Sequence, residues 1–556
     1  MNFTQRLLFI CVFFIALFYS CVEPAKPKPP PKEIVKIPEQ MDPIVRKQIM
    51  GLISQAKEHN GKADDTIILA QPEVVASWYE VYEGGRLWSK DKDWLPRADS
   101  LYEFIRRCEE YGLFPTDYHW RNIRSVFGKL KDSSGKMDAA LWARGELMLS
   151  DAFVTMSRHL KLGRIDRDSI TLRADTLLNL EFYKNLLTSL LDRNDPRRVL
   201  ESVEPGNARY TALRSSIPAF LDSLDRTEFT YIVFPKEDTV TFVKQLQARL
   251  FESSYITFNT RTTDSIELSL AIKRAQEARG LKVDGIAGPA LVGSLNNTGM
   301  ERLRRIAINL DRFKQMPDTM PATYILVNIP EYRMEVWDSG MLVLQSKIIV
   351  GQPKTRTPVL NSEVSNFITF PQWTVPYSII FKEMLPKIQK NIDFLTKQNL
   401  MVVDKNDSVI DPATIDWSKL NKKYFPYLIR QRQGDDNSLG VMKFNFRNKY
   451  DVYMHDTNAR SMFSRPVRAL SHGCVRVQKW DSLSHFLISK EPVHISIDTL
   501  SAWLKRQEKH IVSLRQKTPV FIRYFTCQAG EDGRIIFFDD IYGDDKVLRE
   551  RYFAKK

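Results

Sequence analysis

The sequence has few cysteine and histidine residues and lacks the ligand spacings of the common zinc sites. It contains five cysteines and eight histidines in 556 residues, with no Cys-x-x-Cys pair and no His-Glu-x-x-His segment. Protein zinc sites draw on such closely spaced donors. The sequence therefore predicts no metal site.

Long apolar runs and one-sided charge clusters are also missing. The apolar run from Leu7 to Tyr19 is shorter than the roughly 20 residues that span a bilayer. Hydrophobic residues make up 43% and charged residues 27%, which excludes disorder over most of the length and a multi-span membrane protein. The net charge of +14 suits an anionic surface, but the basic residues form no stripe, so we expect no nucleic acid partner.

The N-terminal segment 1–21 carries the features of an export signal. A basic residue, the apolar run and a small residue before Cys21 resemble a bacterial lipoprotein signal, which implies lipidation of Cys21. An uncleaved N-terminal anchor is the alternative. The Pro/Lys-rich segment 22–40 predicts an extended tether. We therefore expect a protein of the periplasm or cell envelope that is held at a membrane by a lipid or an anchor.

The rest of the chain predicts a multidomain α+β protein. Apolar spacing predicts a helical domain over 41–235, with helices at Ala98–Tyr111 and Leu147–Leu162. A second helical segment over 236–299 begins one helix at a capping box, Asp264 to Glu267.

Strand patterns begin near residue 320. The turn sequence Asp338-Ser339-Gly340-Met341 predicts a hairpin, and the pattern supports a mostly antiparallel β domain over 320–500. A partly helical insertion interrupts it over 377–440, and 501–556 is expected to be a C-terminal extension.

Cys474 differs from the other cysteines of the body. Cys108 lies on a helical apolar stripe and Cys527 in a strand-like run, so both are interpreted as structural. Cys474 follows Ser471-His472-Gly473, and His455 precedes this segment by 15 intervening residues. A cysteine nucleophile needs a nearby base or cation, which either histidine can supply. The amides of Gly473 and Cys474 are candidate oxyanion donors.

These motifs resemble those of two known families. The spacing from His455 to Ser471-His472-Gly473-Cys474-Val475-Arg476 is similar to the signature of L,D-transpeptidases with a YkuD-type catalytic domain. The segment Gln276–Leu295 resembles the small three-helix peptidoglycan-binding domain. Together with a helical scaffold domain and a lid insertion, this indicates the larger, YcbB-like subfamily. One departure is Arg432-Gln433-Gly434, where the family usually has Pro-Gly, which puts the lid conformation in question.

The resemblance implies a reaction on peptidoglycan stem peptides without a cofactor. Cys474 attacks the carbonyl before D-Ala, His455 is the general base, and a diamino acid amine then takes the acyl group to form a 3–3 cross-link. Gly473, His472 and Ser471 shape the site. Arg476 binds a substrate carboxylate, with a structural ion pair as the alternative, and Tyr453 is a second substrate-binding candidate. Carbapenems are the expected covalent inhibitors of such a thiol.

Three other outcomes stay open at this stage. The same site supports an L,D-carboxypeptidase if water reaches the thioester, or attachment of a protein to the wall or its release. The alternative from another class is a wall-binding lipoprotein without catalysis, which predicts a broken Cys–His set, whereas Cys474 and His455 are both present. The acceptor and donor details, the choice of membrane, the oligomeric state and lid regulation do not follow from the sequence.

Overall fold

The computed structural model describes residues 31–82, 85–165, 178–234, 238–257, 265–491 and 495–553. The signal segment with Cys21, most of the tether, and the capping residue Asp264 lie outside these ranges. Within them, no helix is both long and apolar enough to cross a membrane. The chain divides into two compact units, one helical unit that ends at Pro205 and a second unit that continues from Gly206.

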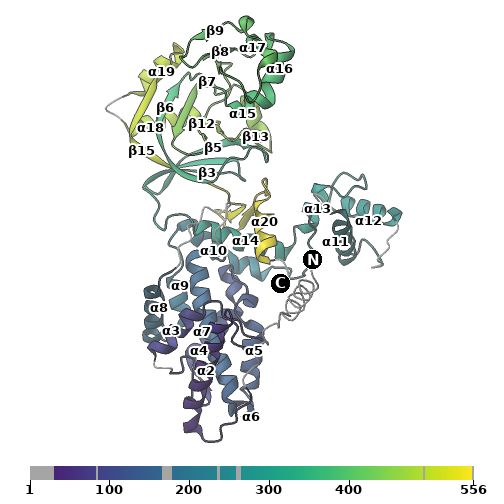
Figure 1. Ribbon diagram of the computed structural model, residues 1–556, viewed down its shortest axis with the longest axis vertical. Helices are drawn as coiled ribbons and strands as arrows, with labels where there is room; N and C mark the ends of the chain where they lie inside the picture. The colour runs from purple at the N-terminus through teal and green to yellow at the C-terminus, as the bar shows by residue number, and fades with distance from the viewer. Residues whose placement is uncertain are drawn as a thin grey trace, which may run out of the picture. The chain divides into compact units, whose positions relative to one another are not determined.

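The helical unit is built around one long helix, α7 (Ala139–Leu162). Its neighbours in contact are α2 (Met41–Glu58), α3 (Pro72–Val81), α4 (Pro96–Arg106), α5 (Trp120–Lys129) and α9 (Pro196–Ser202) (Figure 1). The short helices α6 (Ser133–Lys136) and η1 (Pro38–Gln40), the helix α8 (Leu180–Arg193) and a hairpin of β1 (Ser89–Lys90) with β2 (Asp93–Trp94) complete it. Most residues of α7 are buried, because apolar and small side chains occur on all its faces.

Two helices of this unit differ from their expected bounds. The expected helix Leu147–Leu162 begins earlier, at Ala139, where the Asp138 side chain accepts a hydrogen bond from the Ala140 amide. The expected helix Ala98–Tyr111 divides into α4 and a 3₁₀ turn, η2 (Cys108–Tyr111). Gly112 ends this segment in the left-handed conformation with φ 67°.

Three short helices of the second unit form a separate small core. They are α11 (Thr239–Glu252), α12 (Ser265–Ala278) and α13 (Pro289–Asn296), and their apolar sides pack on one another. The Gln276 side chain accepts hydrogen bonds from the amides of Asp284 and Gly285, which fixes the turn before α13.

A nine-stranded sheet forms the body of the second unit. The strand order is β13-β5-β14-β12-β11-β6-β15-β3-β4, and β4 also pairs with β5, so the sheet closes on itself. Most pairings are antiparallel; β13 with β5, β12 with β14 and β15 with β3 are parallel. The expected hairpin joins β4 to β5, and its turn residues Ser339 and Gly340 have φ 51° and 81°. The strands are β3 (Thr323–Asn328), β4 (Arg333–Asp338), β5 (Met341–Gly351), β6 (Leu360–Thr369), β11 (Met442–Phe446), β12 (Met454–His455), β13 (Ala469–Ser471), β14 (Val475–Val477) and β15 (Ile511–Arg523).

The second unit extends beyond the expected catalytic domain at both ends. Strand β15 belongs to the supposed C-terminal extension, yet it pairs with both β6 and β3 inside the sheet. Helix α10 (Ala208–Asp222), which falls within the expected helical domain over 41–235, packs with α14 (Gly299–Phe313) against β3 and β15. The helices α18 (Trp480–Ser489), α19 (Ile497–Lys505) and α20 (Asp544–Phe553) and the hairpin of β16 (Cys527–Ala529) with β17 (Ile535–Phe537) complete the unit.

The insertion after β6 forms a small subdomain, here called the lid. It has its own four-stranded sheet, ordered β7-β10-β8-β9, and its own apolar core (green in Figure 1). The lid elements are β7 (Trp373–Thr374), α15 (Tyr377–Ile379), the π-helical turn η4 (Ile380–Met384), α16 (Leu385–Lys390), α17 (Asp393–Lys397), β8 (Leu400–Val403), β9 (Val409–Ile410), η5 (Pro412–Thr414), η6 (Trp417–Lys419) and β10 (Leu428–Gln431). Its first and last strands pair at Trp373 and Gln431, so the subdomain is anchored at both ends.

Candidate active site

Three neighbouring strands bring the predicted site residues to one face of the sheet. On β12 and β14, Met454 pairs with Val475 and both lie in the apolar core. Because side chains alternate along a strand, Tyr453, His455 and Arg476 project to the opposite face, and Cys474 lies beside them at the start of β14. On β11, Lys443 is the register partner of His455. We call this set the Cys474 face: Lys443, Tyr453, His455, Cys474 and Arg476.

The Cys474 thiol is half-buried and forms no disulfide with another described residue, and its close partner is Tyr453. Burial raises the pKa of the Cys474 thiol. Hydrogen bonds from the backbone and side chain of Tyr453, and the positive charges of Lys443 and Arg476, oppose that increase. The resting group is therefore a thiol that is surrounded by groups able to stabilise the thiolate.

His455 is buried and electrically neutral. His455 is 4% exposed, and the ring Nδ1 has no hydrogen-bond partner. Burial, followed by the charge of Arg476, lowers the pKa of His455 to about 3. The ring can accept a proton, because a neutral imidazole has one unprotonated nitrogen.

His472 lies in a different environment from His455. Its side chain is 42% exposed, and Nε2 is 2.7 Å from Oε1 of Glu383 in the lid turn η4. Among the hydrogen bonds of the described residues, none joins the Cys474 thiol to either histidine ring. The structure thus directs His472 toward the lid, and of the two rings only His455 has a place on the Cys474 face.

The turn before Cys474 is held by its own side chains. Ser471 Oγ donates to the Cys474 carbonyl at 2.6 Å and accepts from the Gly473 amide at 3.1 Å. Gly473 has φ 123°, which a residue with a Cβ rarely adopts. The Gly473 amide therefore already donates to a side chain of the protein, whereas the sequence predicted it as a donor to the oxyanion.

A loop and the C-terminal tail support this turn from behind. Thr357 Oγ1 donates to the Gly473 carbonyl at 2.8 Å. The Tyr542 hydroxyl accepts from the Thr357 amide at 3.1 Å and donates to the Gly351 carbonyl at 2.8 Å. Thr357 and Tyr542 were not among the predicted site residues, since nothing in the spacing links Tyr542 to Thr357.

Two cations of the Cys474 face have no acidic partner. Among the described residues, neither Lys443 nor Arg476 forms an ion pair. Lys443 Nζ lies 4.0 Å from the centre of the Tyr453 ring. Arg476 Nη1 has only Met462 Sδ, at 3.7 Å, and its buried Nε has no partner. Arg476 thus does not form the structural ion pair that was its alternative, and Lys443 was missed by sequence reasoning.

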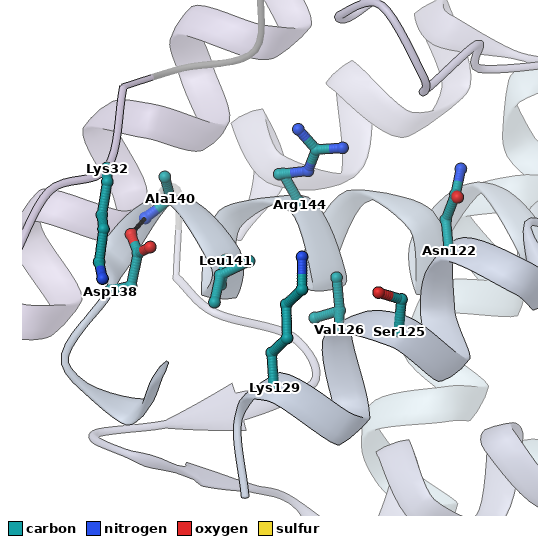
Figure 2. A pocket seen from close by; sticks show the side chains of 9 residues that line it. All are labelled: Lys32, Asn122, Ser125, Val126, Lys129, Asp138, Ala140, Leu141 and Arg144. Carbon is teal, nitrogen blue, oxygen red and sulfur yellow. Dashed lines mark hydrogen bonds between the residues drawn. The ribbon is translucent and has the colours of Figure 1, made fainter. Parts of the chain in front are cut away.

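A pocket in the helical unit offers no comparable chemistry. Figure 2 shows it between α5 and α7, where Lys129 extends toward α7 and the guanidinium group of Arg144 points away from Lys129. Its other lining residues are Lys32, Asn122, Ser125, Val126, Asp138, Ala140 and Leu141, so it holds neither a cysteine nor a histidine. In the ranges that the structure describes, no cluster of three His, Cys, Asp or Glu side chains could hold a metal ion.

Comparison with known proteins identifies the domain that carries the Cys474 face. Residues 322–495 match the YkuD family model, described as "L,D-transpeptidase catalytic domain". Residues 73–217 match a model described as "Scaffold domain", and residues 239–295 match one described as "Putative peptidoglycan binding domain". The chain therefore contains an L,D-transpeptidase catalytic domain together with scaffold and peptidoglycan-binding domains. These are domain types of a cell-envelope protein.

Individual relatives agree with this assignment over part of the chain. A Haemophilus influenzae protein named "Putative L,D-transpeptidase" is 36% identical over 253 residues, which cover 44% of this chain and 49% of the relative. The chain thus spans about half the length of that relative.

Solved structures of L,D-transpeptidases resemble the chain only distantly. The Mycobacterium smegmatis L,D-transpeptidase shares 13% identity over 36% of this chain and 58% of its own, with a TM-score of 0.16. The ertapenem-acylated catalytic domain from Enterococcus faecium shares 13% identity over 37% and 99%, with a TM-score of 0.17. At these TM-scores the two similarities add nothing to the assignment.

Proposed function

We propose that the protein is a peptidoglycan L,D-transpeptidase in which Cys474 is the nucleophile and His455 the general base. The observation that carries the proposal is the Cys474 face itself. A half-buried thiol lies beside a buried, neutral histidine and two unpaired cations, within a domain that matches the L,D-transpeptidase family. Perturbed titratable groups without structural partners are typical of catalytic sites.

The first half of the reaction acylates the enzyme. Cys474 Sγ attacks the stem-peptide carbonyl that precedes D-Ala, and its proton passes to His455. The tetrahedral intermediate then collapses, the C–N bond breaks, and the D-Ala amine leaves with the proton from His455. A thioester between Cys474 and the shortened stem remains. Because the thiol and the imidazole are both neutral at rest, this proton transfer accompanies the attack.

The second half transfers the acyl group. The side-chain amine of a diamino acid in a second stem attacks the thioester and gives its proton to His455. The C–S bond breaks, Cys474 regains its proton, and the product is a 3–3 cross-link. Oxyanion stabilisation is assigned to the Cys474 amide, since the Gly473 amide already donates to Ser471 Oγ. One such donor contributes roughly 3–4 kcal/mol in a comparable site.

Covalent labelling tests the nucleophile. Carbapenems are the expected inhibitors of the L,D-transpeptidase family that the catalytic domain matches, and we propose that they acylate Cys474. Intact-mass measurement should show one adduct on the full chain that maps to Cys474 and is absent from Cys474→Ala. An adduct retained by Cys474→Ala would refute the assignment. Cys108→Ala is the matched control, because that thiol is fully buried and should not contribute.

Analysis of wall digests separates transfer from the alternatives of the same site. Links between two diamino acids, gained on expression and lost in Cys474→Ala, support the transpeptidase. Tripeptide stems without such links would indicate L,D-carboxypeptidase activity, and a stem joined to a protein would indicate attachment to the wall. A Cys474→Ala protein that restored cross-linking in a deletion strain would instead support a non-catalytic wall-binding role.

Membrane attachment is a separate proposal. We infer lipidation at Cys21 from the signal-like segment before it, with an uncleaved anchor as the alternative. Metabolic labelling with a fatty acid should mark the wild type and leave Cys21→Ser unmarked. An unlabelled wild type that still fractionates with membranes would favour the anchor.

A further inference from the structure

The Cys474 face contains more positive charge than its own chemistry requires. Lys443 on β11 and Arg476 on β14 are the register partners of His455 on its two sides. Both side chains are half-buried, and neither forms an ion pair among the described residues. Partly burying two cations without an anion costs free energy, so a retained pair points to an anion that arrives with a ligand.

Neighbouring cations show that this arrangement is specific. Arg460 follows β12 in the sequence, and its Nη2 lies 2.7 Å from Asp456 Oδ2. Arg356, behind the Cys474 turn, has Asp544 at 2.7 Å. Both of these arginines have an acidic partner, whereas Arg476 keeps its Nε buried and unpartnered. A guanidinium group with free N–H donors is suited to bind a carboxylate through two parallel hydrogen bonds.

We propose that Lys443 and Arg476 together form a receptor for a carboxylate of the donor stem peptide, beside Cys474. This inference rests on the proposed function, which supplies a donor that ends in D-Ala. Its C-terminal carboxylate belongs to the leaving group, only a few bonds from the carbonyl that Cys474 attacks. A carboxylate on the diamino acid side chain is the other source of the same chemistry.

Carboxylate binding would also prepare the base. In the free protein the charges of Arg476 and Lys443 both disfavour the protonated form of His455. A carboxylate between these cations offsets their field and makes it easier for His455 to accept the Cys474 proton. Recognition of the correct donor is thus coupled to activation of the nucleophile.

Alkylation of Cys474 tests the receptor without any turnover. Iodoacetate carries a carboxylate and iodoacetamide does not, so the ratio of their rates at Cys474 measures anion recognition independently of thiol reactivity. We expect Lys443→Met to lower this ratio roughly tenfold, as for loss of one charge-assisted hydrogen bond. Lys443→Arg should retain most of it. Lys449→Met is the matched control, since Lys449 also lies over a tyrosine ring but is exposed and outside the Cys474 face.

The alkylation result has a clear contrary outcome. If the two cations act only on the thiolate, both rates fall together in Lys443→Met and the ratio is unchanged, which overturns the proposal. Should Lys443→Met fail to fold, the ratio of the two alkylation rates is measured in Lys443→Gln instead. The wild-type ratio is also compared with that of free cysteine. A wild-type ratio no higher than that of free cysteine also overturns it.

Donor analogues identify the carboxylate. Replacing the C-terminal D-Ala by D-alaninamide, or amidating the diamino acid side chain, removes one carboxylate at a time. One analogue should have a lower kcat/KM than the parent donor in the wild type but not in Lys443→Met. That analogue lacks the carboxylate that the receptor binds. Equal loss in both proteins for both analogues contradicts the receptor. If no donor is turned over, the proposed function fails, while the alkylation ratio still decides the receptor.

Discussion

In the helical unit, the buried carboxylate of Glu146 accepts hydrogen bonds from the amides of Leu87 at 2.8 Å and Trp88 at 3.1 Å and from two hydroxyl groups. On the Cys474 face, the equally buried His455 keeps Nδ1 unpartnered, and Arg476 does the same with Nε. The first site has the satisfied polar network of a structural element. The second leaves one ring nitrogen and one guanidinium N–H without a close partner, although His455 also interacts with the backbone of Asp456 and Leu439.

This difference predicts that the two sites respond oppositely to substitution. Changes on the Cys474 face should reduce activity and have little effect on stability, because no internal hydrogen bond of His455 Nδ1 or Arg476 Nε is lost. Changes at Glu146 should reduce stability and leave the Cys474 chemistry intact.

His455→Asn should have the largest effect on activity. Loss of the general base is expected to reduce kcat for 3–3 cross-linking by about 10²–10⁴-fold. The thermal unfolding transition should remain near that of the wild type. Cross-linking of purified stem peptides, followed by mass spectrometry, measures the rate. His510→Asn is the matched control, since His510 stacks on Trp503 and pairs with Glu508 outside the site.

Glu146→Leu should give the opposite result. The amides of Leu87 and Trp88 would remain buried without an acceptor, which is expected to destabilise the helical unit by about 3 kcal/mol. Calorimetry of the full chain should show one transition moved to lower temperature, with the rate of Cys474 alkylation by iodoacetamide unchanged. Glu103→Leu, which removes only an exposed helix pair, should change stability by less than about 0.5 kcal/mol. A comparable loss in both variants would contradict the contrast.

The pH dependence of local stability should report His455. Its pKa is lowered to about 3 in the folded protein, against an ordinary value near 6.5. Between these values the unfolded chain binds a proton that the folded chain does not, so stability falls as pH falls, by roughly 1.4 kcal/mol per pH unit. Hydrogen exchange of peptides from β12 and β14, compared with His455→Asn at each pH, measures the effect. An identical pH profile in the two proteins would show that His455 is not held neutral.

Local patterns in the sequence predicted the helices, the strands and the pair of Cys474 and His455. They predicted less well which other residues surround that pair. The turn at Ser339-Gly340 follows from conformations that few residue types adopt, so residue type alone locates it. Cys474 and His455 are found by residue type and spacing. The sequence predicted strands in the catalytic domain, because segments of strand-forming residues between turn residues form strands in most contexts.

What the sequence could not provide depends on pairings between distant segments. Lys443 faces His455 only because β11 and β12 pair in one register, and a shift by one residue would turn it to the core. Tyr542 reaches Thr357 across 185 positions. The Gly473 amide is occupied because Ser471 adopts a particular rotamer. Likewise, β15 lies inside the sheet through long-range pairing, and nothing in its own composition separates it from an extension.

Glu383→Gln should have the smallest effect, because it alters a pair that is exposed on both sides. The side chains of His472 and Glu383 are 42% and 47% exposed, and such ion pairs contribute about 0–1 kcal/mol. We therefore expect kcat/KM to change by less than about fivefold, and less still at high salt. His472→Gln should match it, and the double variant should lose no more than either single one if the two residues act as a pair. A loss beyond about tenfold in Glu383→Gln would place this lid contact in the chemistry and remove the distinction between the two histidines.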